Sequence, residues 1–428
     1  MIRAVLIGAG IRGARAYAPY ALTHPHELGF AAVAEPDERK RLHFAERHGI
    51  ADSGRFASWE TLLSGPKLGD LALICTQDNE HFEPAMRALR QGYHVMLEKP
   101  MSPDPVQTMA LAEEARRLGK ELFVCHVLRY TPYFQTLKQL VDDNRIGRLM
   151  SVQWNENVGY WHQAHSYVRG NWRNAGLSSP MLLAKSCHDL DLIGWLLEEE
   201  CTHVSSFGDL SYFKEERAPA GSTARCTDGC AVEAECSYSA LKWYYNEKDE
   251  WPHNVPSLEP KLEQRWKAIT EGPYGRCVFR CDNDVVDHQI VNMRFRSGAT
   301  AAFTMTGFTK DSSRTFKLMG TEGEIRGHLE KNEIELALFT GQRELIVPPK
   351  LEGGHSGGDY GMVRDVVKRI RQGEETFGRT HGIVSALSHM LVFAAEQSRA
   401  SGQTVAFGEY IRSVREQVSG MEPVNEVS

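Results

Sequence analysis

Short apolar runs alternate with amphipathic stretches through roughly the first 125 residues of the chain. Five of these runs predict buried strands, at residues 4–7, 29–35, 70–76, 94–98 and 122–125. The stretches between them have helical spacing and predict helices at residues 38–47, 80–91 and 104–118. Strands that alternate with helices in this way predict a doubly wound parallel sheet of the α/β class. Ligands of such sheets lie at the carboxyl ends of the strands.

From about residue 126 the pattern changes to alternating apolar and polar positions. Helices are predicted at residues 132–143, 181–197, 360–371, 382–401 and 408–418. Strands are predicted at residues 149–156, 202–209, 284–296, 299–306, 315–320, 324–329 and 333–339. We therefore expect a dinucleotide-binding Rossmann domain at residues 1–125, followed at 126–428 by an α+β domain with a large, mostly antiparallel sheet. A polar stretch with several prolines interrupts this second domain and is interpreted as an insertion at residues 211–275.

Composition narrows the class of protein. The 428 residues are 42% hydrophobic and 25% charged, which is typical of a globular protein of more than one domain. A net charge of −7 provides no basic field for nucleic acid, and no apolar run approaches the ~20 residues of a membrane span. The N-terminus lacks the pattern of a signal peptide, and nine cysteines, an odd number, fit a reducing compartment. We expect a cytoplasmic protein that binds neither nucleic acid nor membrane.

Three glycines follow the first predicted strand, at Gly8, Gly10 and Gly13, and a helix-favouring stretch follows them. In this G-x-G-x-x-G spacing the first glycine permits a tight turn, the second lets the backbone approach a pyrophosphate, and the third lets the helix pack against the strand. The intervening Ile11 and Arg12 are expected to lie against the same ligand. The glycine loop therefore predicts a dinucleotide site.

The second predicted strand ends in Glu35. A carboxylate at this position accepts hydrogen bonds from both adenosine ribose hydroxyls and repels a 2′-phosphate, so NAD is favoured over NADP. Arg12 could act in the opposite sense by reaching a 2′-phosphate, but the acid at the ribose usually decides the preference. The alternative is that Glu35 merely starts a turn before Pro36.

Four polar residues stand where later strands of this sheet are predicted to end: Thr76, His81, Glu98 and Lys99. They should line one crevice beside the glycine loop. A lysine next to a nicotinamide ring can assist removal of the proton of an alcohol. The alternative for Lys99 is a solvated side chain before the turn at Pro100.

The predicted helix at residues 181–197 carries three polar side chains among apolar ones. Lys185 stands three residues before His188 and four before Asp189, so the three share one side of the helix. A cation, an imidazole and a carboxylate suit proton transfer better than they suit packing. The alternative is a buried Lys185–Asp189 ion pair that simply seats the helix.

Residues 160–173 are rich in aromatic and basic residues and are interpreted as a loop. Such a loop can line a pocket for a polyhydroxylated ligand, and its arginines suit an anionic group on that ligand. A lid or an interface loop is the alternative. On a later loop, the glycine-flanked His355 is interpreted as solvated. The expected substrate contacts are His165, Tyr167, Arg169, Trp172 and Arg173.

These segments resemble the Gfo/Idh/MocA family of oxidoreductases, which includes glucose-fructose oxidoreductase and inositol dehydrogenase. The resemblance rests on GAGIRG at residues 8–13, AEPD at 34–37, TQDNEH at 76–81 and, most specifically, Glu-Lys-Pro at 98–100. It implies a catalytic or substrate-orienting Lys99 near the nicotinamide, followed by a proline that is often in a cis bond. Thr76-Gln77 is a mild departure, because the family usually has Thr-Pro there.

The resemblance continues, more loosely, through the second domain. Trp172-Arg173 and a helix that bears His188-Asp189 are similar to the family's substrate-side motif. The family commonly has an Asp four residues before the His, where this chain has Ala184, and we expect the neighbouring Lys185 to take over part of that role. His188 is then the best candidate to accept or donate a proton, with Lys185 and Asp189 tuning it.

Three cysteines lie close together within the insertion, at Cys226, Cys230 and Cys236. Together with Cys277, Cys281 or a histidine they could hold zinc, but their spacing matches no standard zinc motif. Free thiols, or an occasional disulfide, are the favoured interpretation, so no metal is expected.

We therefore expect an NAD-dependent oxidoreductase that oxidises a ring hydroxyl of a sugar, a sugar derivative or a cyclitol. The catalytic set would be Lys99, Lys185, His188 and Asp189. One alternative is an NAD-dependent glycosidase that oxidises the sugar at C3, eliminates the aglycone, adds water and reduces again, as on a sulfoquinovoside. Another is a catalytically silent NAD-binding regulator. By analogy with the family, a homodimer or homotetramer is expected.

Overall fold

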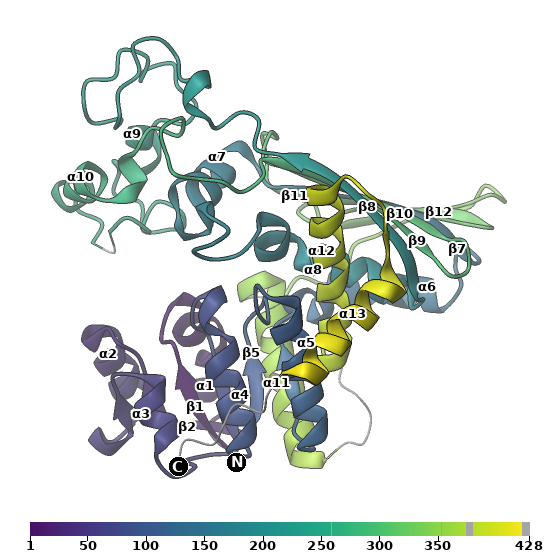
Figure 1. Ribbon diagram of the computed structural model, residues 1–428, viewed down its shortest axis with the longest axis horizontal. Coiled ribbons are helices and arrows are strands. Elements are labelled where there is room, and N and C mark those ends of the chain that lie inside the picture. The colour runs from purple at the N-terminus through teal and green to yellow at the C-terminus, as the bar shows by residue number, and fades with distance from the viewer. Residues whose placement is uncertain (258, 352, 374–379, 422–428) are drawn as a thin grey trace.

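The computed structural model describes residues 1–257, 259–351, 353–373 and 380–421. Figure 1 shows the first part of the chain below, a large sheet at the upper right and an insertion at the upper left. The lower unit holds a six-stranded parallel sheet in the order β3-β2-β1-β4-β5-β6. Its strands are β1 (Ile2–Ile7), β2 (Leu28–Ala34), β3 (Arg55–Phe56), β4 (Leu71–Ile74), β5 (His94–Leu97) and β6 (Leu122–Val124).

This sheet confirms the predicted doubly wound parallel fold. The central strands are buried on both faces, as expected of a parallel sheet covered by helices on each side. Asp37 and Asp104 cap the second and fifth helices by accepting hydrogen bonds from two backbone N–H groups each. The helical segments are η1 (Ile11–Tyr17), α1 (Pro19–Thr23), α2 (Glu38–His48), α3 (Trp59–Ser64), α4 (Phe82–Arg90) and α5 (Pro105–Arg117).

The second sheet has nine strands and is mostly antiparallel, as predicted. Its order is β14-β13-β12-β11-β7-β10-β9-β8-β15, and the pair β7–β10 is parallel. The strands are β7 (Leu149–Asn157), β8 (Cys201–Asp209), β9 (His288–Phe295), β10 (Thr300–Thr306), β11 (Ser313–Gly320), β12 (Gly323–His328), β13 (Glu333–Leu338), β14 (Arg343–Ile346) and β15 (Val405–Ala406).

One face of this sheet packs on helices and the other is open. Along β9 buried and exposed residues alternate strictly, which is the pattern of a sheet with one covered face. The apolar cluster beneath that face joins side chains of the sheet mainly to those of three helices. These helices are α6 (Pro132–Asp142), α8 (Met181–Leu197) and α12 (Gly382–Ser401), and α13 (Phe407–Gly420) follows β15.

Helix α11 (Gly358–Gln372) comes late in the chain but packs on the first sheet, among the much earlier elements of the lower unit in Figure 1. Its apolar residues Met362, Val363 and Val366 share a buried cluster with residues of β1, β2 and η1. The parallel sheet is therefore covered on one side partly by a segment from the C-terminal half.

Residues 160–173 are helical, which corrects the prediction of a loop. They form α7 (Tyr160–His162), the π-helical segment η5 (Gln163–Arg169) and a short 3₁₀ turn, η6 (Asn171–Arg173). Most of η5 is buried because the insertion packs over it. The insertion contains two short helices of its own, α9 (Ala240–Tyr244) and α10 (Leu262–Glu271).

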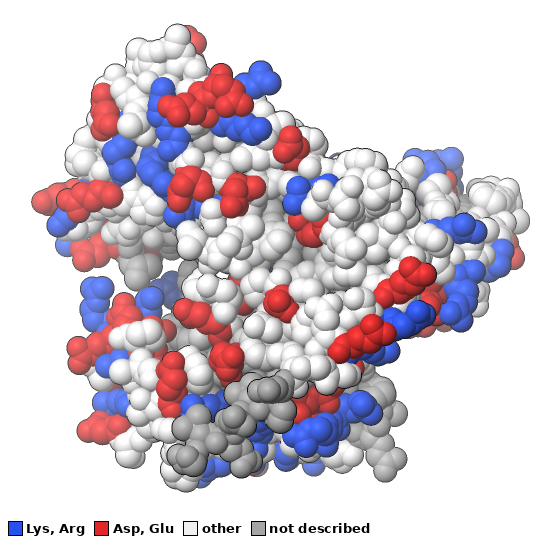
Figure 2. Space-filling view, viewed as in Figure 1, with Lys and Arg blue, Asp and Glu red and all other residues white. Residues whose placement is uncertain are grey.

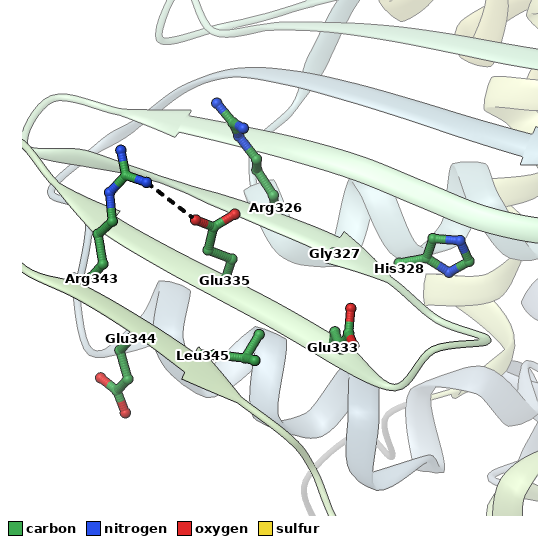
Figure 3. A pocket seen from close by; sticks show the side chains of 8 residues that line it. All are labelled: Arg326, Gly327, His328, Glu333, Glu335, Arg343, Glu344 and Leu345. Atoms are coloured by element: carbon green, nitrogen blue, oxygen red, sulfur yellow. Dashed lines mark ion pairs between the residues drawn. The ribbon is translucent and has the colours of Figure 1, made fainter.

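The outer strands of the large sheet carry an open hollow of about 420 Å³ (Figure 3). It is lined by charged side chains of β12, β13 and β14, among them the ion pair of Arg343 with Glu335 at 3.9 Å. Ion pairs on exposed strands are ordinary surface features, so this hollow has no mark of a functional site. No helix among the described residues is long and apolar enough to span a membrane.

Candidate active site

The glycine loop has the geometry of a phosphate cradle. Gly8 has φ of +90°, and a Cβ there would lie 2.5 Å from the carbonyl oxygen of Cys75. A Cβ on Gly13 would lie 2.4 Å from the carbonyl oxygen of Gly8, so η1 packs too closely on the loop for any larger residue. Gly10 instead faces open space, with no described atom within 4 Å of an added Cβ. That space at the start of η1 is where the diphosphate of a dinucleotide fits.

Glu35 lies beside this loop, at the end of β2. Its carboxylate accepts hydrogen bonds from the backbone N–H of Ala9 at 2.8 Å and of Asp37 at 3.0 Å. These bonds fix the carboxylate and leave further lone pairs for ribose hydroxyls. Ile11, whose side chain is exposed, begins η1 on the same side of the loop. The residues present therefore fit NAD.

Replacing Glu35 with glutamine should weaken discrimination between the two dinucleotides. The variant loses the negative charge that repels a 2′-phosphate, so the ratio of kcat/KM for NAD over NADP should fall about tenfold or more. Initial rates with each dinucleotide measure the ratio. The matched control is Glu38→Gln on the exposed first turn of α2, which should leave the ratio unchanged. An unaltered ratio in Glu35→Gln would contradict the assignment.

Arg12 points away from Glu35 and into a buried ionic network. Its guanidinium donates to Glu98 at 2.6 Å and to Asp359 at 2.8 Å, and the hydroxyl of Tyr17 also donates to Glu98 at 2.6 Å. Burial alone would raise the pKa of Glu98, but the charges of Arg12 and Lys99 outweigh it and lower that pKa. Arg12 therefore holds Glu98 and Asp359 in place at the crevice end of the site, where it would not contact a 2′-phosphate.

Lys99 joins the two domains at the end of β5. Its ammonium Nζ donates to the carbonyl oxygen of Ala184 on α8 at 2.7 Å, while its backbone N–H donates to Glu98 at 2.9 Å. The Lys99–Pro100 bond is cis, as the family resemblance implies. Ala184, which stands where the family commonly has an Asp, therefore contacts Lys99 through its backbone carbonyl.

Thr76 and His81 shape the neighbouring turn. His81 is buried, and its two ring nitrogens face the carbonyl oxygens of Pro100 at 2.6 Å and Thr76 at 3.2 Å. The hydroxyl of Thr76 donates to the carbonyl of Glu80 at 3.0 Å. His81 thereby ties the ends of β4 and β5 together and Thr76 closes the turn after β4, so both would support a bound cofactor through the backbone they hold.

His188 lies on α8 next to this junction. It is buried and makes no hydrogen bond with any described residue, and its Nδ1 is fully enclosed. Its ring lies 5.6 Å from that of His126 and 6.5 Å from that of His355. Burial lowers the pKa of His188 well below 6.5, and the nearby charge of Lys99 adds to this effect. A neutral imidazole with an unused nitrogen can accept a proton.

The alternative interpretation of a Lys185–Asp189 ion pair does not hold, because each side chain has another partner. Lys185 pairs with Glu156 at 3.1 Å. Asp189 accepts from the indole N–H of Trp154 at 2.9 Å and from Arg314 at 2.8 Å. Trp154 and Glu156 stand on the same face of β7, directly under α8, so the helix meets both. Asp189 is therefore a buried residue that fixes α8 to the sheet, and its carboxylate has no hydrogen bond with the His188 ring.

A second acid on α8 anchors the other side of the helix. Asp191 accepts from Arg129 at 2.6 and 2.7 Å and from Ser388 of α12 at 2.8 Å. Burial would raise the pKa of Asp191, but Arg129 outweighs burial and lowers it. The contacts of Asp189 with the sheet and of Asp191 with α12 prevent α8 from rotating about its axis. They hold His188, the residue before Asp189, toward the crevice.

Two predicted substrate residues face the insertion instead. Arg169 is buried and donates to the carbonyl oxygens of Arg276 and Tyr238, both at 2.7 Å. His165 hydrogen-bonds the hydroxyl of Tyr244 at 2.8 Å and stacks on Tyr274. These contacts correct the expectation that Arg169 and His165 line the substrate pocket, because the insertion occupies both side chains.

The other three predicted substrate residues lie nearer the crevice. Arg173 forms a two-point ion pair with Asp282, at 2.7 and 3.0 Å, so an anionic substrate would have to displace a carboxylate. Trp172 donates its indole N–H to the buried Asp78 at 3.1 Å. The hydroxyl of Tyr167 has no hydrogen-bond partner among the described residues, and the ring packs between those of His162 and Trp172.

Figure 2 shows a notch between the upper lobe, which carries the insertion, and the lower lobe, which carries the parallel sheet. The carboxyl ends of β1, β4 and β5 and the start of α8 meet between these lobes (Figure 1). Acidic and basic side chains are interspersed over the visible face, so no single-sign patch marks it for nucleic acid.

Several residues of the site escaped sequence reasoning. Glu156 could have been found from the sequence, because it stands two residues after Trp154 and therefore faces the same side of a predicted strand. Arg314 and Asp359 reach the site from remote segments that no local pattern connects to it. His355, interpreted as solvated, is exposed, and it also hydrogen-bonds Asp359 at 3.0 Å and approaches His188.

The stability of the protein should fall as the pH drops below about 6.5. Burial lowers the pKa of His126 to about 4 and that of His389 to about 3. His389 accepts a hydrogen bond from the backbone N–H of Met101 through Nε2, so protonation would place two donors face to face. Since the unfolded chain binds these protons first, each such histidine should cost about 1.4 kcal/mol per pH unit between pH 6.5 and its folded pKa.

Urea unfolding at a series of pH values measures this effect. His389→Gln removes one titrating group, so its unfolding free energy should depend less steeply on pH between about 6.5 and 4. A wild-type unfolding free energy that is constant across this window would contradict the prediction.

Comparison with known proteins follows the division of the fold. Residues 2–126 match the family GFO_IDH_MocA, "Oxidoreductase family, NAD-binding Rossmann fold". Residues 138–407 match GFO_IDH_MocA_C, "Oxidoreductase family, C-terminal alpha/beta domain". The two matches correspond to the parallel sheet and to the nine-stranded sheet.

Individual proteins resemble this chain with modest sequence identity. The putative oxidoreductase YteT of Bacillus subtilis is 23% identical over 312 residues, which cover 69% of this chain and 72% of YteT. The inositol 2-dehydrogenase of Streptomyces avermitilis is 32% identical over 178 residues, or 41% of this chain and 47% of that enzyme. The structure of a levoglucosan dehydrogenase in complex with NADH and L-sorbose superposes with a TM-score of 0.70 at 18% identity, covering 94% of this chain and 98% of that one.

Proposed function

The chain belongs to the Gfo/Idh/MocA family of NAD-binding oxidoreductases, and we propose that it oxidises a ring hydroxyl of a sugar, a sugar derivative or a cyclitol. The observation that carries this proposal is the hydrogen bond of 2.7 Å from Lys99 to the carbonyl of Ala184. It brings the end of the dinucleotide-binding sheet to the helix that carries His188. An alcohol held there would meet an ammonium group and a neutral imidazole together.

Each residue of the site has its own role in the proposed reaction. Gly8, Gly10 and Gly13 would hold the diphosphate of NAD and Glu35 its adenosine ribose. When bound, NAD supplies the hydride acceptor. Lys99 would donate a hydrogen bond to the reacting oxygen and stabilise its developing charge, and His188 would accept the hydroxyl proton. Because the enclosed Nδ1 has no room for a substrate, the proton would go to Nε2.

Lys185 and Glu156 complete the proposed proton path. Ala184 has no carboxylate, whereas Lys185 lies one residue further along α8 and pairs with the buried Glu156. Burial raises the pKa of Glu156, although Arg314 and Lys185 oppose the effect. This pair would orient a second substrate hydroxyl and exchange protons with it.

The relatives and the site both support the proposed substrate class. Two similar proteins are named for the polyhydroxylated compounds inositol and levoglucosan. The crevice offers hydrogen-bond donors and acceptors close to an aromatic ring, that of Tyr167, which is the usual composition of a sugar pocket. An anionic group on the sugar is not required, because Arg173 is already paired with Asp282.

Incubation with NAD and a panel of sugars, cyclitols and glycosides tests the proposal. NADH that forms in proportion to oxidised, otherwise intact substrate is the expected result. Release of an aglycone without net NADH would replace the proposal by the glycosidase reaction with transient oxidation at C3. Tight NAD binding with no product from any member of the panel would indicate a catalytically silent protein.

Self-association through the open face of the nine-stranded sheet is also proposed. Phe207 and Ile290, on neighbouring strands of that face, have exposed fractions of 61% and 40%. Exposed apolar side chains on a flat sheet are typical of protein interfaces. Sedimentation velocity should therefore show a dimer or tetramer, and a monomer would contradict this part of the proposal.

A further inference from the structure

The insertion between β8 and β9 is poor in both regular structure and apolar core. Its two helices are short, and its buried apolar side chains fall into two small clusters. One cluster contains Ala164, Val168 and Phe213, and the other contains Ala240, Tyr244 and Ile269. Loop-rich segments with so little core usually require a cross-link or a metal to hold them.

Four cysteines of this region line a single small cavity. Cys226, Cys230 and Cys236 come from one segment and Cys277 from another. The two segments are joined by backbone, because the N–H of Cys226 donates to Gly275 and the N–H of Cys277 donates to Ala224, each at 2.9 Å. The cavity measures about 20 Å³, which suits one ion or one water molecule and excludes an iron–sulfur cluster.

A buried positive charge faces this cavity. Arg169 is 1% exposed and lines the cavity together with the cysteines. Apart from two backbone carbonyls, its guanidinium donates to the sulfur of Cys226 at 3.9 Å, and no carboxylate pairs with it among the described residues. An arginine keeps its charge in a protein, and a buried charge requires a counter-charge. Deprotonated thiols would provide that counter-charge.

The sulfur of Cys226 accepts hydrogen bonds from two donors. Besides Arg169, the backbone N–H of Ala240 at the start of α9 donates to its sulfur at 3.4 Å. Donors of this kind surround cysteine ligands of metals and stabilise their negative charge. Cys281 is different, because its thiol donates to the carbonyl of Cys277 at 3.3 Å and does not line the cavity.

We propose that Cys226, Cys230, Cys236 and Cys277 bind one zinc ion in a tetrahedral site. Zinc is the divalent ion that four thiolates in such a structural site usually hold. Each thiol would release a proton on binding, and Arg169 would offset part of the negative charge that remains. Among the described residues, no three cysteine, histidine or carboxylate side chains are already close enough together to hold a metal ion. Binding of zinc would therefore draw the four sulfurs into the cavity.

The site would reach the crevice through η5. Arg169 ends η5, and the same segment continues back to α7 and His162, whose ring contacts the indole of Trp251 in the insertion at 4.9 Å. A zinc ion would therefore fix the insertion against the elements that border the substrate side. This inference does not depend on which sugar, or which net reaction, the protein uses.

Metal analysis of the full chain, purified without chelator, tests the proposal. About one zinc per chain is expected for the native sequence. Cys230→Ser and Cys277→Ser should each reduce the zinc content about tenfold under the same dialysis, whereas the matched control Cys281→Ser should retain it. A Cys281→Ser variant that loses zinc, or a Cys277→Ser variant that retains it, would overturn this ligand set.

A second measurement on the native sequence guards against variants that fail to fold. A thiol reagent should modify four more cysteines in the presence of a strong chelator than in its absence, while NAD binding shows that the first domain remains folded. Equal numbers of reactive thiols with and without chelator, together with no zinc uptake from a zinc-containing buffer, would overturn the proposal.

Discussion

Replacing Lys99 with methionine should lower kcat/KM about a thousandfold. Methionine has a similar length but lacks the ammonium group that lies 2.7 Å from the carbonyl of Ala184 and would contact the reacting oxygen. The affinity for NAD should change little, because the diphosphate and ribose contacts lie at the glycine loop and Glu35. Initial-rate kinetics on the substrate identified by the panel, with NAD binding followed by fluorescence, measure the two effects separately.

Lys99→Arg distinguishes the positioned hydrogen bond of the ammonium group from its charge. Arginine keeps the positive charge, but its planar group does not fit the position of an ammonium. The activity of Lys99→Arg should therefore remain at least about tenfold below that of the native enzyme. Full activity in this variant would reduce the role of Lys99 to electrostatic attraction, and unchanged activity in Lys99→Met would refute its participation.

Asp189→Asn should destabilise the protein by about 3 kcal/mol and affect the chemistry far less. Asp189 is fully buried and shares Arg314 with Glu156, so its loss leaves that arginine with one carboxylate in place of two. Urea unfolding gives the loss of stability. The rate per folded molecule should fall less than about tenfold, because the Asp189 carboxylate bonds Trp154 and Arg314 and has no hydrogen bond with the His188 ring.

The neighbouring His188→Asn is the matched comparison. It should lower kcat by about a hundredfold or more and change the free energy of unfolding by about 1 kcal/mol. If Asp189→Asn instead abolished turnover at native stability, Asp189 would be acting on the proton path, as first expected from the sequence.

The fold and the cofactor were predictable because their signals are local. Gly8, Gly10 and Gly13 have fixed spacing after an apolar run, and each has the steric role that the spacing indicates. Helix α8 was predicted with its observed bounds, since apolar residues at helical spacing cover its whole length. The match of both domains to one oxidoreductase family confirms these predictions.

The partners of the polar side chains were not predictable, because they come from distant segments. Helical spacing correctly placed Lys185 and Asp189 on one side of α8, but it could not show that Glu156 and Arg314 lie beneath them. Arg169 and Arg173 had the composition expected of an anion site, yet one faces the cysteine cavity and the other Asp282. Residue type suggests what a side chain can do, whereas packing decides what it meets.

Helix α11 has a consequence for how the protein is made. Met362, Val363 and Val366 belong to the core of the first sheet, and Asp359 at the start of that helix neutralises Arg12 beside Glu98. A ribosome adds on the order of ten residues per second, so the first domain leaves the ribosome many seconds before the helix that completes it. During that interval an apolar face of the nascent sheet remains uncovered, and Arg12 has Glu98 but not Asp359 as a partner. The dinucleotide-binding half should therefore engage chaperones until synthesis passes Gln372, and only then become competent to bind NAD.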